Sequence, residues 1–111
     1  MNLTVDSSGD VKILRIREGR LVYAKLGDFL AEVTRLVDSG ARKLILDFSD
    51  VQYVDSASIG CLMNIYHLLS EREGVVKLVG LQDRVETMVG LTGIQNLIDV
   101  YPEEKAALAS F

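Results

Sequence analysis

The pattern of apolar and polar positions changes its period several times along the chain, which indicates that strands and helices alternate. Near the start, two short β-type runs surround the turn-rich residues 7–10, as expected for a hairpin. Residues 43–48 (KLILDF) and 75–80 (VVKLVG) form short apolar runs that end in turn residues. Because such runs suit strands covered on both faces, we expect residues 43–48 to form a central, buried strand.

Helical spacing appears in two longer segments. From Lys25 onwards apolar residues recur at steps of three and four, and Gly40 provides a C-terminal stop. The apolar positions of this segment are Leu26, Phe29, Leu30, Val33, Leu36 and Val37. Gly27 interrupts the pattern, and it either lets another chain approach closely or delays the helix start to Asp28, which could then cap it. A second helix is expected to begin near Ser56, and both helices should pack on one face of the sheet.

The remaining segments continue the alternation. Residues 81–93 predict a short helix ended by glycines, residues 96–101 a last strand or loop, and residues 102–111 a short terminal helix opened by the only proline. Strands that alternate with helices predict an α/β sheet with helices packed on it. A length of 111 residues, without linker or repeat, further predicts one domain over residues 1–111.

Composition and charge narrow the class of function. With 49% hydrophobic and 25% charged residues the chain is typical of a globular domain, and its single cysteine, Cys61, excludes an intramolecular disulfide. A formal net charge of −4 argues against nucleic acid or an anionic membrane as the main partner. No apolar run reaches the length of a membrane span, and residues 1–10 lack the basic and apolar regions of a signal peptide. We therefore expect a cytoplasmic protein without membrane insertion.

The sequence YVDSASIG, residues 53–60, raises the main functional question, because an apolar run breaks there into an acid and small hydroxylated residues. It lies where a strand ends and a helix begins, the usual place of function in open α/β sheets. One interpretation is structural: Asp55 or Ser56 caps the helix by accepting a backbone N–H, worth roughly 1 kcal/mol. Another is regulatory, because a phosphate on a hydroxyl at a helix N-terminus is favoured by the backbone N–H groups and the helix dipole.

A catalytic interpretation of the same serine fails on its partners. A nucleophile elbow requires a glycine two residues before and two after the serine, whereas Ser56 is flanked by Val54 and Ser58. The only histidine, His67, lies eleven residues further along the same expected helix, roughly 16 Å away. No phosphate-binding glycine loop is present either. We therefore expect no catalytic residue and no cofactor.

The isolated histidine and cysteine favour structural roles. His67 has no second histidine or cysteine at metal-ligand spacing, so we expect no metal site and a surface or boundary position. Cys61 follows Gly60 near the expected helix start, where a thiol pKa can fall, but an unpaired cysteine is more often a small buried hydrophobe.

The segment LILDFSDVQYVDSASIGCLMNIYHLL, residues 44–69, resembles the central segment of STAS domains, in particular of bacterial anti-sigma factor antagonists. The family signature has a strand, a DxSxVxxxD spacing, and then Asp-Ser followed by Ser, Thr or Ala and Gly-Leu-Gly leading into a helix. Gly19 and Leu21 fall where the family has its Gly-x-Leu-Asp turn, and residues 74–81 and 85–102 resemble its later strand and its ending. The resemblance covers nearly the whole chain. It implies a single STAS domain, an α/β fold with a mixed sheet of mainly four to five strands.

The resemblance also implies a switch protein rather than an enzyme. In the family, a serine kinase that is also an anti-sigma factor phosphorylates the domain, and a serine phosphatase restores it. The unmodified form captures the kinase and frees the sigma factor. Carried over by position, Ser56 matches the phosphorylated serine, and Asp55 matches the acid that precedes it.

Two departures from the family pattern open an alternative. Ala57 and Ser58 stand where the family has a hydroxylated residue and a glycine, and Val22 replaces the acid of the Gly-x-Leu-Asp turn. By position, the partner-binding surface that the resemblance implies comprises Val22, Asp55, Ser56, Ala57 and Ser58. The alternative is a non-phosphorylated STAS scaffold subunit of a signalling assembly or of a lipid-trafficking ABC transporter complex. Nothing in the sequence defines the oligomeric state.

Overall fold

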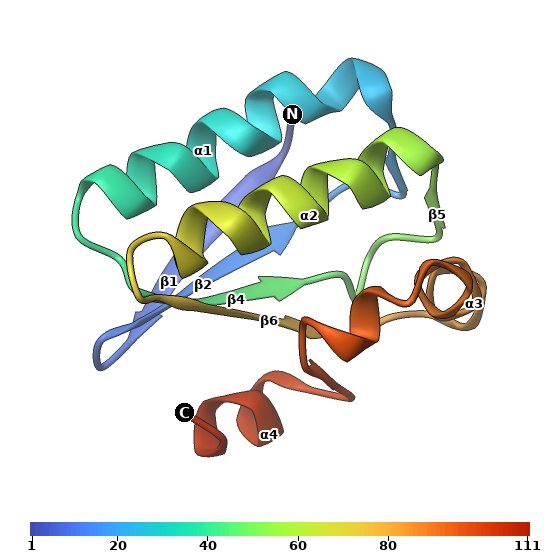
Figure 1. The fold of residues 1–111 in the computed structure, drawn as a ribbon. Helices are drawn as coiled ribbons and strands as arrows, with labels where there is room; N and C mark the ends of the chain where they lie inside the picture. The colour runs from blue at the N-terminus through green and yellow to red at the C-terminus, as the bar shows by residue number, and fades with distance from the viewer.

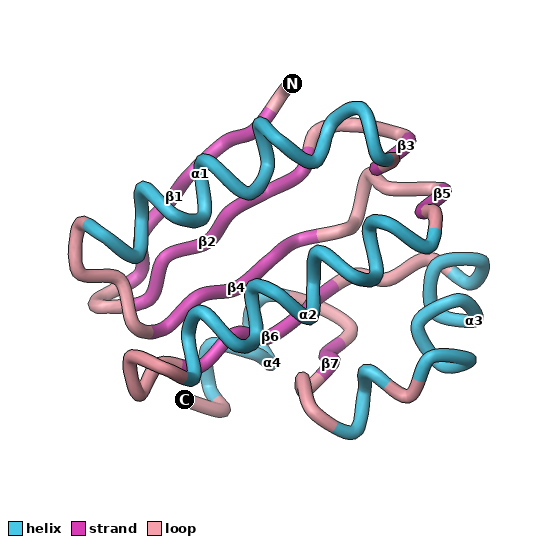
Figure 2. Tube along the Cα trace, turned by 45° about the horizontal axis from the view of Figure 1, so that its top comes forward, coloured by secondary structure: helices cyan, strands magenta, loops and turns pink.

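The computed structural model describes residues 1–111 and contains a five-stranded sheet of order β1-β2-β4-β6-β7. Its strands are β1 (Leu3–Ser8), β2 (Val11–Ile16), β4 (Lys43–Asp47), β6 (Val75–Val79) and β7 (Val100–Tyr101). Only β1 is antiparallel to its neighbour, and Gly9, with a φ of 60°, forms the expected hairpin turn to β2. The other strands are parallel, with β4 at the centre, so the predicted central strand and mixed α/β sheet are confirmed (Figure 2).

Two long helices lie side by side on one face of this sheet, as predicted (Figures 1 and 2). They are α1 (Leu26–Asp38) and α2 (Ser56–Ser70), and both begin at the same end of the molecule. The structure corrects one boundary: α1 begins at Leu26, so Gly27 lies in its first turn and Asp28 is not its cap. The short 3-10 helix η1 (Tyr23–Lys25) leads directly into α1, so the helical geometry begins before the glycine.

Two shorter helices complete the fold. Helix α3 (Asp83–Thr92) lies at the end of the sheet near the start of α2, and Gly93, with a φ of 75°, ends it as predicted (Figure 1). After the 3-10 helix η2 (Ile94–Asn96) and β7, helix α4 (Glu104–Ala109) covers the opposite face of the sheet from α1 and α2. The longest helix, α2, has 15 residues, and none of the helices combines the length and the apolar character of a membrane span.

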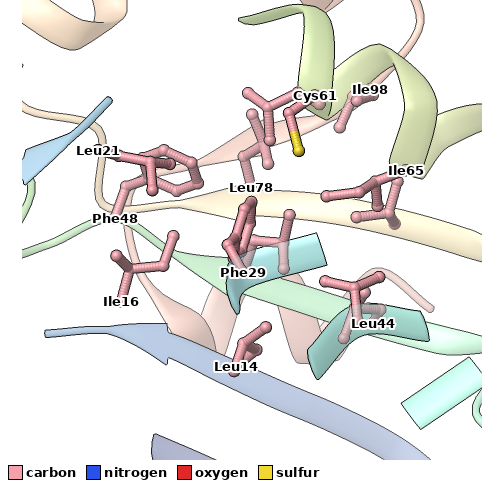
Figure 3. Close-up of a cluster of buried hydrophobic side chains, with 14 of the residues drawn as sticks. Leu14, Ile16, Leu21, Phe29, Leu44, Phe48, Cys61, Ile65, Leu78 and Ile98 are labelled. Carbon is pink, nitrogen blue, oxygen red and sulfur yellow. The ribbon is translucent and has the colours of Figure 1, made fainter. Parts of the chain in front are cut away.

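The main core fills the space between the sheet and the long helices (Figure 3). Its 24 buried residues include Phe29 of α1, Leu44 of β4 and Leu78 of β6. Cys61 is buried in α2 with its sulfur directed into this cluster, which confirms its predicted role as a small hydrophobe. Burial also raises the pKa of its thiol, so the thiolate is disfavoured.

A second, two-stranded parallel sheet positions the functional site. It pairs β3 (Arg20–Leu21) with β5 (Tyr53–Val54), and the Gly19 carbonyl accepts the backbone N–H of Gln52 at 2.8 Å. This pairing places the segment that enters α1 beside the segment that enters α2. The starts of both helices therefore form one surface at the carboxyl end of the parallel strands.

Candidate functional site

The start of α2 is organised by the carboxylate of Asp55. Asp55 has extended backbone angles and is the helix cap, with Oδ1 accepting the backbone N–H of Ser58 at 2.9 Å. Its other oxygen, Oδ2, accepts the backbone N–H of Tyr23 at 2.9 Å. One carboxylate thus caps α2 and also ties it to the segment before α1, which the sequence alone did not indicate.

Hydrogen bonds keep this carboxylate ionised. Partial burial acts to raise the pKa of Asp55, but the bonds from Ser58 and from the Tyr23 backbone outweigh burial and hold the pKa below its ordinary value. Asp55 therefore carries a full negative charge at neutral pH, and both of its oxygens are occupied by donors within the chain.

Ser58 lies beneath this surface rather than on it. Its side chain has 0% exposure, and its hydroxyl lies within hydrogen-bond distance of the Leu21 carbonyl and of Asp55 Oδ1. A hydroxyl in place of the family's glycine therefore adds a link between α2 and β3. In this structure Ser58 supports the candidate surface from inside and is not accessible to a modifying enzyme.

Ser56 is the accessible hydroxyl of the motif. It is the first residue of α2, its side chain is exposed, and it forms no side-chain hydrogen bond within the chain. Asp55 performs the capping, so the structure assigns the cap to the acid and leaves the Ser56 hydroxyl without a structural partner. Ser56 therefore lies at the N-terminus of α2, where backbone N–H groups point outwards. The next residue, Ala57, is half-buried.

Two residues of the neighbouring segment complete the surface. Val22 is half-buried, so a polar side chain at this position would still reach solvent. Tyr23 is 76% exposed, an unusual position for a large aromatic side chain. Sequence patterns did not single out Tyr23, because no local periodicity marks its position.

The structure separates Ser56 from a base. His67 is exposed on α2, about three turns beyond Ser56, and its ring contacts Tyr66 edge to face with centroids 5.4 Å apart. No group of three His, Cys, Asp or Glu side chains is arranged to hold a metal ion. The site therefore presents an exposed hydroxyl, that of Ser56, and an exposed aromatic side chain, that of Tyr23.

Comparison with known proteins gives a consistent family match. The family model of the STAS domain matches residues 2–107. A Thermotoga neapolitana protein, provisionally named an anti-sigma factor antagonist, is 32% identical to this chain over 72 residues. These residues are 65% of this chain and 64% of that protein, so the match spans slightly less than two thirds of the relative.

Solved structures extend the likeness to the whole fold. A provisionally named anti-sigma factor antagonist from Thermotoga maritima has a TM-score of 0.89 at 26% identity, covering 97% of this chain and 92% of that chain. The anti-sigma factor antagonist SpoIIAA of Bacillus shares the fold in its phosphorylated form, with a TM-score of 0.75 at 16% identity and coverages of 99% and 100%. Its unphosphorylated form has a TM-score of 0.76 at 14% identity, with coverages of 98% and 96%.

Proposed function

Because the chain belongs to the STAS domain family, we propose that it is an anti-sigma factor antagonist, a regulatory binding protein switched by phosphorylation of Ser56. The partner is an anti-sigma factor serine kinase, and a serine phosphatase reverses the modification. The unmodified form binds the kinase in the cytoplasm, and phosphate on Ser56 weakens the complex. The whole chain, residues 1–111, acts as one binding domain with no catalytic step of its own.

One observation carries this proposal: Ser56 has an exposed hydroxyl without a partner, while the neighbouring Asp55 performs the capping. If Ser56 served as the helix cap, its own hydroxyl would accept the backbone N–H that Asp55 accepts here. Phosphate adds about −1.5 to −2 charges, which a helix N-terminus tolerates and a desolvated protein interface does not unless it supplies arginines. Modification at Ser56 therefore changes the binding surface and leaves the fold intact.

The direct test is phosphorylation by an anti-sigma factor serine kinase with a histidine-kinase-like ATPase fold. After incubation with this kinase and ATP, intact-protein mass spectrometry should show one added phosphate on the wild-type chain and none on Ser56→Ala. Ser70→Ala is the matched control, because Ser70 is an exposed serine at the opposite end of α2. Phosphate retained on Ser56→Ala would refute the assignment of the modified residue.

Binding gives the second test. Ser56→Ala should bind the kinase as the unmodified wild type does and cost at most roughly 1 kcal/mol of folding stability. Ser56→Asp should weaken the complex while the fold survives. If the Ser, Ala and Asp forms all bind equally and no phosphate is found at Ser56, the serine has no switching role.

Val22 supports one second candidate, a non-phosphorylated scaffold subunit of a signalling assembly or of a lipid-trafficking ABC transporter complex. A valine at the place of the family's acid removes a carboxylate from the neighbourhood of Ser56. Under the antagonist proposal, Val22→Asp should raise the rate of phosphorylation with little loss of stability, because the side chain is half-buried. Under the scaffold proposal, Val22→Asp leaves the chain unphosphorylated.

A further inference from the structure

A groove of about 420 Å³ opens between the amino-terminal halves of α1 and α2, beside Ser56. We call it the α1–α2 groove and define it by its eight lining residues, which are Tyr23, Leu26, Gly27 and Leu30 on one side and Ala57, Gly60, Cys61 and Asn64 on the other. None of its eight lining residues is charged. It is therefore an uncharged depression in the surface of a chain whose formal net charge is −4.

The fold itself does not require the two glycines that line the groove. Gly27 and Gly60 both lie within helices, and a Cβ atom added at either would meet nothing within 4 Å. Gly74 and Gly80 differ, because a Cβ there would approach the Arg42 carbonyl to 2.8 Å and Ser49 Oγ to 2.4 Å. Since glycine is less favourable than alanine in a helix, Gly27 and Gly60 weaken their helices and gain no packing within the chain.

The charged groups next to the groove are neutralised inside the chain. Lys25 Nζ lies 2.8 Å from Glu18 Oε1, and the N-terminal amine lies 3.4 Å from Asp28 Oδ2. Asp55 accepts its hydrogen bonds from Ser58 and the Tyr23 backbone. The groove thus offers no unpaired charge to a ligand, and burying a charged group in it would leave that group without a partner. Its complement is an uncharged, apolar group.

Tyr23 gives the groove a contact residue at its rim. Its backbone is fixed by the bond to Asp55, while its side chain is 76% exposed. An exposed aromatic side chain beside an apolar depression is typical of the residues that contribute most to protein interfaces. A second copy of this chain suits the groove less well, because two chains of net charge −4 repel each other.

We propose that the α1–α2 groove receives an uncharged apolar side chain of the partner protein, with Gly27 and Gly60 permitting close approach of the partner's backbone. This inference rests on the proposed function, because the partner is the one controlled through Ser56. Ser56 precedes Ala57 of the groove, so a phosphate there places an unpaired charge at its rim. An apolar occupant would then have to desolvate that charge, which connects the modification to release of the partner.

The test combines stability and affinity in the same variants. Gly27→Ala, Gly60→Ala and the double variant are compared with Gly90→Ala, whose added Cβ also meets nothing within 4 Å but lies in α3, outside the groove. Isothermal titration calorimetry with the serine kinase should give a Kd at least roughly tenfold weaker for the double variant and unchanged for Gly90→Ala. Thermal unfolding should show a higher midpoint for Gly60→Ala and Gly90→Ala, by roughly 3–5 °C.

The outcomes separate this inference from the proposed function. Higher stability with weaker binding in the groove variants, together with weaker binding of Ser56→Asp, supports both. If Ser56→Asp binds weakly while the double glycine variant binds like Gly90→Ala, the groove inference is overturned and the proposed function stands. A lower unfolding midpoint of the double variant also overturns the inference, since the fold would then need the glycines. If the wild-type chain does not bind the kinase, the proposed function fails and the groove inference with it.

Discussion

The two faces of the sheet are closed by different kinds of interaction. On the face under α1 and α2, 24 buried residues form one hydrophobic cluster. On the face under α4 the buried cluster has five residues, among them Ile45 of β4 and Ala107 of α4. A helix of six residues cannot bury the apolar surface that two helices of 13 and 15 residues bury.

On the α4 face, hydrogen bonds from charged side chains compensate for the smaller buried apolar cluster. Arg15 of β2 donates from Nε and Nη2 to the two carboxylate oxygens of Glu104, each at 2.8 Å. Near the other end of α4, Lys77 of β6 donates to Ser110 Oγ at 2.6 Å. A long amphipathic helix is held by buried area, whereas this short helix is held by directional bonds near both of its ends. The comparison predicts that the two faces respond differently to substitution and to pH.

The largest expected effect is on the hydrophobic face. Phe29→Ala removes a fully buried aromatic ring from α1 and should lower the free energy of unfolding by about 3–5 kcal/mol. Leu108→Ala is the matched truncation on α4, and it should cost about 1 kcal/mol because Leu108 is only half-buried. Urea denaturation of both variants measures the difference, and equal losses would show that the two faces contribute alike.

The hydrophobic face is also the part of the fold that the sequence predicted best. Helical spacing around Phe29 and the apolar run of residues 43–48 are local signals of burial, and both predict the observed elements, although α1 begins at Leu26 rather than at Asp28. The side of the sheet on which α4 packs was not predictable, because the Arg15–Glu104 contact joins residues 89 positions apart. Likewise, the sequence shows the motif around Ser56, but not the burial of Ser58, whose hydroxyl bonds to the Leu21 carbonyl of β3, 37 positions earlier.

A smaller effect is expected when one charge is removed from the α4 face. Glu104→Gln keeps the shape of the side chain but leaves the half-buried Arg15 guanidinium only its longer contacts with Asp6 and Asp47, at a cost of about 1–3 kcal/mol. Hydrogen exchange should then show faster exchange in α4 and unchanged protection in α1 and α2. Glu103→Gln, at an exposed neighbouring position, is the control and should leave exchange as it is. Uniformly faster exchange over all helices would contradict a separate attachment of α4.

The same ion pair makes the α4 face sensitive to acid. The hydrogen bonds from Arg15, followed by the bond with Asp47, lower the pKa of Glu104 from 4.5 to about 2. A carboxyl whose pKa is lowered in the folded state stabilises the fold above its unfolded pKa, and this contribution is lost as the pH falls from 4.5 towards 2. Burial, and then the bond with Glu104, raise the pKa of Asp47. Protonation of Asp47 therefore favours the folded state as the pH falls, and it partly offsets the loss of stability that comes from Glu104.

Acid titration of stability therefore distinguishes the two faces. The wild type should lose stability between pH 4.5 and about 2, and Glu104→Gln should lose less over the same interval because its amide does not titrate. Phe29→Ala should keep the wild-type slope at a lower overall stability. Chemical denaturation at a series of pH values gives these slopes, and parallel curves for wild type and Glu104→Gln would exclude the Arg15 pair as the cause.

The smallest effect is expected from replacing a whole buried charge rather than one of its partners. The Lys77 side chain is 7% exposed, and its ammonium lies 4.5 Å from the ring centre of Phe111 and within hydrogen-bond distance of Ser110. The attraction of the ammonium to these groups is offset by the cost of removing the charge from water. Lys77→Met, which is of similar length and apolar, should therefore change the free energy of unfolding by less than about 1 kcal/mol.

Ser110→Ala should cost more than Lys77→Met, since it keeps the buried ammonium and removes an acceptor. Urea denaturation of the two variants decides the order. If Lys77→Met proved as damaging as Phe29→Ala, the α4 face would depend on its buried cation as strongly as the other face depends on its apolar core.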